Sequence, residues 1–271
     1  MTRWRIGSVP FLNERPLTVA LEEDENIELE RLPPGPLADK LAAGEFDVAL
    51  IPVAEQLRHG LEAVGGLGIA CRGPVESVRV WHECPREKLA RILVPTHSRS
   101  SVMLLRLLLT HWGCPDAELV PTEYPEDMAE PPDEPALIIG DSALRCLAAG
   151  RPSTDLGAAW HELTGLPFVF ARWVGRPGLA ARLPASPIHD YPAIVGAMDR
   201  LSLESLLLGA HIASHAHPQD IAATEGPARG ISVERALAYL SETVVYALDE
   251  SCEAGQAEFA RRAREAGLLD R

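Results

Sequence analysis

The chain has 271 residues, 46% of them hydrophobic, and carries a formal net charge of -14. Its length and apolar content are enough for one large domain or two small lobes with cores. A chain this acidic is a poor candidate for binding nucleic acid or an anionic membrane surface. Lysine occurs only at Lys40 and Lys88. Neither lies in a convincing site motif, so Schiff-base chemistry is not indicated.

The cysteines and the N-terminal segment indicate the compartment. The five cysteines are scattered, without a CxxC pair, which is typical of reduced thiols rather than of a disulfide framework. The segment MTRWRIGSV lacks the apolar core of a signal peptide, and no apolar run reaches transmembrane length. We therefore expect a cytoplasmic, soluble protein with no membrane partner and no nucleic-acid partner.

Strand and helix patterns alternate along the chain. The predicted strands cover residues 5–9, 27–32, 46–53, 78–81, 90–95, 117–124, 136–141 and 168–174. The predicted helices cover residues 17–23, 37–43 and 98–113, and the pattern is helical from Tyr191 to the end, with interruptions near His217 and Gly230. The proline-rich acidic segment 128–135 is expected to be an exposed loop. This order predicts an α/β protein with mainly parallel sheets and a helical C-terminal tail.

The strands fall into two groups, which predicts two lobes with a ligand cleft between them. Residues 1–80 and 172–271 are assigned to the first lobe, and residues 81–171 to the second. Two crossings between the lobes, near residues 75–82 and 168–175, return the helical tail to the first lobe.

Several motifs that suggest a cofactor or a nucleophile are incomplete. In GDSALRC, Leu144 stands where a nucleophile elbow needs its second glycine. His211 and His215 are four residues apart and could share a helix face around a metal, but no carboxylate follows at the matching position. Solvated or capping histidines are the favoured interpretation. GGLGIACRG departs from the dinucleotide fingerprint and opens no helix. We expect neither a metal nor a cofactor.

Polar residues at strand ends make a better case for a ligand site. Ser98, Ser100 and Ser101 follow a strand and begin the clearest predicted helix, beside Arg99. A helix N-terminus offers free N–H groups and positive potential to a carboxylate or phosphate, although plain N-capping by serine is the alternative. SVPFLN, ALIPVAE and IIGDSAL also end strands. In open α/β sheets ligands bind at such ends, so four strand ends could converge on one cleft.

Six segments, in order, resemble a known family over essentially the whole chain. They are RIGSVPFLNERPL, GEFDVALIPVAE, GPVESV, SRSSVMLLRLLL, IIGDSALR and FVFARWVGRPG. Together they resemble the chorismate dehydratases of menaquinone biosynthesis. The resemblance implies the two-lobed fold of type II periplasmic binding proteins. It also implies a lyase that dehydrates chorismate, a small dianion, to 3-[(1-carboxyvinyl)oxy]benzoate in the first step of the futalosine route, without metal, nucleotide or lysine.

The resemblance also implies a set of site residues. Asn13 is expected to contact the reacting ring region and to be catalytic. Asp141 would line the far wall or brace its loop. The residues expected to bind substrate are Ser8, Ser77, Ser100, Ser101 and Asp141. No Asp, Glu or His in these motifs is clearly placed as the general base. One hypothesis is that the enolpyruvyl carboxylate of the substrate takes the proton while Asn13 orients it.

The chain departs from the family pattern at three positions. Ser100 takes the place of a usual threonine, His97 lies where an acidic residue is frequent, and Phe11 stands where tyrosine is common. Neither His97 nor the three histidines of HIASHAHPQD is assigned a role, and the oligomeric state is open.

Three other readings remain. The first is a binding protein for a small carboxylate, and the second is the effector-binding lobe of a transcription regulator. The third is the paralogous dehypoxanthinyl futalosine cyclase. The opening motif of that enzyme is Cys-Pro-Asn-Asp-Thr, and the segment SVPFLNERP of this chain does not match it.

Overall fold

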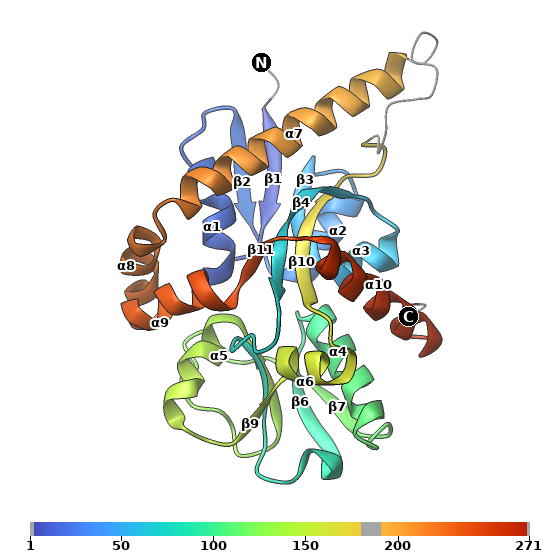
Figure 1. Cartoon of the computed structure of the whole chain (residues 1–271), viewed down its shortest axis with the longest axis vertical. Coiled ribbons are helices and arrows are strands. Elements are labelled where there is room, and N and C mark those ends of the chain that lie inside the picture. The colour runs from blue at the N-terminus through green and yellow to red at the C-terminus, as the bar shows by residue number, and fades with distance from the viewer. Residues whose placement is uncertain (1–2, 180–190, 270–271) are drawn as a thin grey trace.

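The computed structural model describes residues 3–179 and 191–269, with side chains in the long helix only from residue 198 onward. In this part of the chain the strands form two separate sheets, one in the upper half and one in the lower half of Figure 1. The first sheet has the order β11-β4-β10-β3-β1-β2. Its strands are β1 (Trp4–Ser8), β2 (Ile27–Arg31), β3 (Val48–Pro52), β4 (Ala63–Cys71), β10 (Phe168–Gly175) and β11 (Val245–Ala247). We call this sheet with its helices the first lobe.

The second sheet has the order β7-β6-β8-β5-β9 and, with its helices, makes the second lobe. Its strands are β5 (Val78–Trp81), β6 (Arg91–Pro95), β7 (Glu118–Thr122), β8 (Ala136–Ile139) and β9 (Ser153–Asp155). The chain passes between the sheets at residues 72–77 and again just before β10. These segments lie beside the crossings expected from the sequence. Residue by residue, the division into 1–80 plus 172–271 and 81–171 stays a prediction.

Both sheets are mixed. Pairing is parallel where β1 lies between β2 and β3, and where β6 lies between β7 and β8. Pairing is antiparallel where β10 meets β3 and β4, where β11 meets β4, and where β5 meets β8 and β9. The predicted parallel pattern therefore describes one side of each sheet. The crossing strands β5 and β10 enter each sheet from the other lobe, so they run against their neighbours.

Helices cover both lobes. In the first lobe they are α1 (Arg15–Thr18), α2 (Pro34–Ala42), α3 (Val53–His59), α7 (Tyr191–His215), α8 (Pro218–Ala228), α9 (Val233–Ala238) and α10 (Glu250–Glu265). In the second lobe they are α4 (Arg99–His111), α5 (Gly140–Cys146) and α6 (Leu156–Thr164). The tail is interrupted next to His217 and Gly230, as predicted. It is not helical throughout, because β11 leaves it to pair with β4. Among the described residues, no helix combines the length and apolar character needed to cross a membrane.

Each lobe has its own core, and α10 joins them. Every residue of β3 is buried, as expected for a continuous apolar strand covered on both faces. In the second lobe Trp160 packs edge-on against Phe168 and against Phe259 of α10, with ring centroids 5.4 and 6.2 Å apart. The C-terminal helix therefore contributes to the core of the second lobe as well as covering the first (Figure 1).

Candidate functional site

A cavity of about 70 Å³ lies between the two lobes. Strand ends and crossing segments from both sheets form its walls, including the apolar side chains of Phe11 and Phe170. Among the described residues that line it, none carries an ionisable side chain. The polar side chains in the wall are those of Asn13, Ser77, Ser98, Ser100 and Ser101. Of the predicted site residues, the structure thus brings Asn13, Ser77, Ser100 and Ser101 together.

Asn13 lies in the turn Leu12–Glu14 that follows β1. Its amide Nδ2 donates a hydrogen bond to the hydroxyl of Tyr239 (3.0 Å), and that hydroxyl donates in turn to Ser77 Oγ (2.8 Å). The other amide atom, Oδ1, is buried and has no hydrogen-bond partner among the described residues. A buried acceptor without a partner costs about 1–3 kcal/mol, so a donor on a ligand would recover that free energy.

Tyr239 connects the two predicted residues Asn13 and Ser77 through hydrogen bonds. It is only 1% exposed and follows α9, 226 positions from Asn13. Burial raises the pKa of its phenol well above the ordinary value, so it keeps its proton and acts as a donor near neutral pH. No motif in the helical tail includes Tyr239, so the sequence does not predict it as a site residue.

The crossing segment before β5 places Ser77 in the wall. Glu76, next to it, has a φ of 61°, a strained conformation for a residue other than glycine. The carboxylate of Asp155 accepts hydrogen bonds from the backbone N–H groups of Val75 and Glu76, and it also caps α6. Asp155 therefore holds the segment in this shape. Its position before a helix marks it as a cap, but nothing in the sequence connects it to Ser77.

The two serines at the start of α4 lie between the lobes. Ser100 and Ser101 are 3% and 4% exposed. Ser100 Oγ accepts a hydrogen bond from the backbone N–H of Ala54 at the start of α3 (3.0 Å), and Ser98 makes no side-chain cap to the helix. The Ser100 hydroxyl proton remains available to a ligand. The positive end of a 13-residue helix points to the same place, which favours an anion.

On the opposite side, Phe11 packs against Gly140 of the second lobe. A Cβ at Gly140 would lie 2.8 Å from the Phe11 ring, and the glycine has a φ of +63°. Any side chain here would both strain the backbone and push the lobes apart. The glycine of IIGDSAL thus allows the close contact.

Ser8 and Asp141 are not part of the cavity wall. Ser8 is fully buried and donates to Glu14 Oε2 (3.0 Å). Asp141 Oδ1 accepts from the backbone N–H of Leu12 (3.0 Å), and Oδ2 pairs with Arg229 Nε (3.1 Å). Burial raises the pKa of Asp141, although both contacts act in the opposite direction. The polar atoms of both side chains form contacts within the protein, and neither residue lines the cavity.

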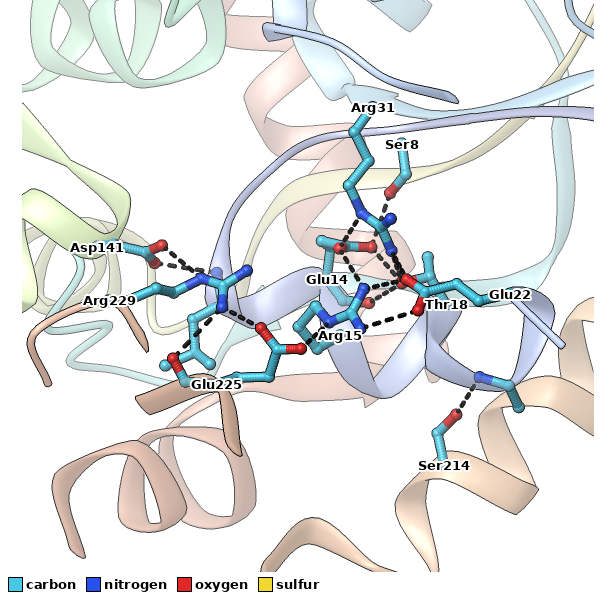
Figure 2. Close-up of polar contacts among 12 residues, drawn as sticks. Ser8, Glu14, Arg15, Thr18, Glu22, Arg31, Asp141, Ser214, Glu225 and Arg229 are labelled. Carbon is cyan, nitrogen blue, oxygen red and sulfur yellow. Dashed lines mark hydrogen bonds and ion pairs between the residues drawn. The ribbon is translucent and has the colours of Figure 1, made fainter. Parts of the chain in front are cut away.

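Glu14, the residue after Asn13, is at the centre of a buried polar cluster (Figure 2). Its carboxylate is fully buried and accepts hydrogen bonds from Ser8, Thr18 and Arg31, with Arg31 Nε at 2.7 Å. Arg15 Nη1 lies 3.5 Å from the same carboxylate. These contacts fix the end of β1 and the turn that carries Asn13.

A chain of ion pairs continues from this cluster to the second lobe (Figure 2). Arg15 Nε donates to Glu225 of α8 (3.0 Å), Glu225 pairs with Arg229, and Arg229 pairs with Asp141. Since Asp141 also holds the N–H of Leu12, the turn next to the cavity is tied to the second lobe directly and through α8. Sequence patterns do not predict this connection, because the residues that form it are far apart in the chain.

Within the part of the chain that the structure describes, His211 and His215 do not belong to a group with metal-ligand spacing. His211 Nδ1 lies 3.0 Å from the carbonyl oxygen of Pro16, and its ring stacks near that of His215. Within the described residues, the one group with metal-ligand spacing is Asp39, Glu55 and His59. There, Arg99 and Arg58 already pair with the Glu55 carboxylate. Burial lowers the pKa of His97, which is not among the residues of the cavity wall.

Solved structures with the same arrangement define the class of fold. A structural-genomics protein from Archaeoglobus fulgidus superimposes with a TM-score of 0.65 at 18% identity, covering 98% of each chain. The periplasmic aliphatic sulphonate binding protein of Escherichia coli gives 0.65 at 14% identity, covering 100% of this chain and 94% of the other. The alkanesulfonate-binding protein of Xanthomonas axonopodis pv. citri gives 0.61 at 18%, covering 99% and 94%. The chain therefore has the periplasmic-binding-protein fold.

The family is more specific. Residues 4–265 match a family model described as menaquinone biosynthesis, so the chain belongs to this menaquinone-biosynthesis family. A relative from Thermus thermophilus named chorismate dehydratase is 32% identical over 163 residues. That alignment covers 53% of this chain and 59% of the relative, so it spans little more than half of either protein.

Proposed function

We propose that this chain is a carbon–oxygen lyase that removes water from chorismate to give 3-[(1-carboxyvinyl)oxy]benzoate. The observation that carries the proposal is the cavity wall, in which one amide and a group of serines face apolar side chains without an ionisable group among the described lining residues. Such a wall can hold carboxylates by neutral donors and leaves acid–base chemistry to the substrate. The family match and the chorismate dehydratase relative support the same reaction.

The reaction needs one proton removed and one hydroxyl expelled. The proton leaves the ring carbon that bears the enolpyruvyl ether, and its electron pair spreads through the double bond to the ring carboxylate. Loss of the neighbouring hydroxyl then makes the ring aromatic, and the proton and hydroxyl leave as water. Because no Asp, Glu, His or Lys lines the cavity among the described residues, we assign the base to the substrate's own enolpyruvyl carboxylate.

The protein's part is to bind and to orient. The serine hydroxyls and the start of α4 would hold the carboxylates through hydrogen bonds and the helix dipole. Asn13, which lines the cavity and has a buried Oδ1 without a hydrogen-bond partner among the described residues, would orient the reacting groups. We assign Ser8 and Asp141 to bracing the turn that carries Asn13 rather than to touching substrate. No cofactor enters this scheme, and the cytoplasmic location expected from the sequence belongs to the same proposal.

Binding requires the lobes to separate. The cavity of about 70 Å³ is well below the roughly 300–1,000 Å³ of ordinary small-molecule sites. Phe11 against Gly140 and Arg229 against Asp141 close the two lobes on each other. We propose that chorismate enters when these contacts open, and that closure then excludes water from the reacting ring.

The test is direct. Purified protein treated with a chelator is mixed with chorismate, and the products are followed by chromatography and mass spectrometry. We expect the loss of one water with the enolpyruvyl group retained. A mock purification from host cells that do not express the protein controls for contaminating enzymes. Unchanged chorismate with a folded sample would refute the proposal and favour a protein that only binds a carboxylate.

Tyr239→Phe tests the link that holds Asn13 and Ser77 together. The change removes one hydroxyl and keeps the buried ring, but it leaves Asn13 Nδ2 and Ser77 Oγ without this partner. We therefore expect the free energy of unfolding to fall by about 1–3 kcal/mol. Turnover of the folded protein should fall by about 10-fold or more in kcat, because misplaced groups lose orientation. Steady-state kinetics and thermal melting measure both. An unchanged kcat would show that Tyr239 does not position Asn13.

A further inference from the structure

The face of α7 that points away from the first lobe is unusually apolar. In the described part of the chain, the large hydrophobic side chains with the greatest exposure are Met198, Leu201, Leu208 and Ile212, at 61, 55, 49 and 62%. All four lie on α7. Figure 1 shows this helix crossing over the first lobe and extending beyond it, away from the second lobe. An exposed apolar patch that is continuous in this way marks an interaction surface.

The four side chains form one stripe. They are separated by three, seven and four residues, and Ser205 occupies the intermediate position. This is the a/d spacing of a heptad repeat, which places all five positions along one seam of a helix. From Met198 to Ile212 the seam is about 21 Å long at 1.5 Å per residue. Spacing of this kind fits another helix packed alongside.

The other side of α7 is already used. Leu203, Leu207 and Ala210 are buried, in the core cluster of the first lobe. The helix is therefore apolar on two opposite sides, which is typical of a helix covered on both. The first lobe covers one side, and among residues 3–179 and 198–269 nothing covers the other.

Charge identifies the partner. None of the exposed positions of α7 from 198 to 215 is Asp, Glu, Lys or Arg, although 24% of the whole chain is charged. The charged residues of this stretch, Asp199, Arg200 and Glu204, are half-buried at the edge of the exposed face, and Arg200 pairs with Glu204. A membrane-bound helix would carry basic residues beside its apolar stripe. Two copies of a chain with a charge of -14 repel each other, so their contact is best placed on an uncharged face.

We propose that the stripe Met198, Leu201, Ser205, Leu208 and Ile212 of α7 packs against the same stripe of a second copy, in a two-fold helix-to-helix interface. A two-fold contact uses the same surface on both copies, and a stripe of one chemical kind is complementary to itself. Ser205, which is small and lies in the middle of the stripe, allows the two helices to approach closely. The interface lies on the first lobe alone, so it leaves the lobes free to open. This inference does not depend on the proposed reaction.

Sedimentation velocity and light scattering over a range of protein concentrations test the interface. We expect wild-type protein to show twice the 29.3 kDa mass of one chain. Leu208→Asp and Ile212→Asp each place a charge in the stripe at an exposed position, so both should fold and sediment as monomers. Ala223→Asp adds the same charge at an exposed position of α8, outside the stripe, and should remain dimeric.

The proposal is overturned by a wild-type protein that is monomeric at every concentration. It is also overturned if both stripe variants remain dimeric with unchanged melting temperatures, because the contact would then lie elsewhere. Flotation of monomeric wild-type protein with neutral phosphatidylcholine vesicles, lost in Leu208→Asp, would instead identify a membrane surface as the occupant and refute the dimer.

Discussion

Replacing Asn13 with alanine is expected to reduce kcat for chorismate dehydration by at least about 10²–10³-fold, the effect of removing a preorganised polar group from a catalytic site. Among the described residues of the cavity wall, Asn13 has the one amide side chain, and its Oδ1 has no hydrogen-bond partner there. Its loss removes an orienting group and releases the Tyr239 hydroxyl. Single-turnover kinetics, which isolate the chemical step from product release, measure the effect.

Asn13→Asp is the companion variant. It keeps the shape of the side chain but places a negative charge in a buried wall, facing a dianionic substrate, so we expect equally low turnover with weaker binding. A melting temperature close to that of the wild type shows that the fold is intact. Near wild-type kcat in both variants would remove Asn13 from the mechanism and would require another group to orient the substrate.

Replacing Glu14 with glutamine is expected to destabilise the protein by about 3–5 kcal/mol, the usual cost of removing one partner from a buried ion pair. The Glu14 carboxylate is fully buried and accepts hydrogen bonds from Ser8, Thr18 and Arg31. Glutamine has nearly the same volume but leaves Arg31 facing a neutral group. Urea denaturation at neutral pH, with the free energy extrapolated to zero denaturant, measures the loss.

Glu22→Gln is the matched control. Glu22 contacts the same guanidinium groups of Arg15 and Arg31, but its side chain is 36% exposed, so solvent screens the pairs. We expect a loss under about 1 kcal/mol. Equal losses in the two variants would contradict the view that burial of Glu14, rather than the number of its ion pairs, stabilises this corner of the first lobe.

Local patterns in the sequence predicted many of the elements. The run FDVALIPV predicted β3 because a strand covered on both faces needs apolar residues at every position. SRSSVMLLRLLLTHWG predicted α4 because its serine start, apolar stripe and closing glycine all act within a few residues. Strand-end motifs predicted that the turn with Asn13 would meet the α4 serines, since strand ends of an open α/β sheet converge on ligands. Ser77 was implied by the family resemblance instead.

Glycine-rich and short strands were missed. The strand β4 pairs with β10 and β11 but was not predicted, because its segment GGLG is rich in glycine and gives little strand signal on its own. Its glycine at position 68 is explained by packing, because a Cβ there would lie 2.5 Å from the carbonyl oxygen of Ala171. Likewise β11 is three residues long and lies in a tail that otherwise reads as helix.

The sequence by itself thus determined the α/β class, many of the strands and helices and the family pattern, because each depends on neighbours within a few positions. It also predicted Asn13 and three serines that line the cavity, together with Ser8, which does not. Only the tertiary structure decided that Tyr239 joins Asn13 to Ser77, and that Asp141 contacts the N–H of Leu12 and does not line the cavity. Tyr239 lies 226 positions from Asn13. The partners of a buried polar group are set by how whole elements pack, and local periodicity carries no information about that.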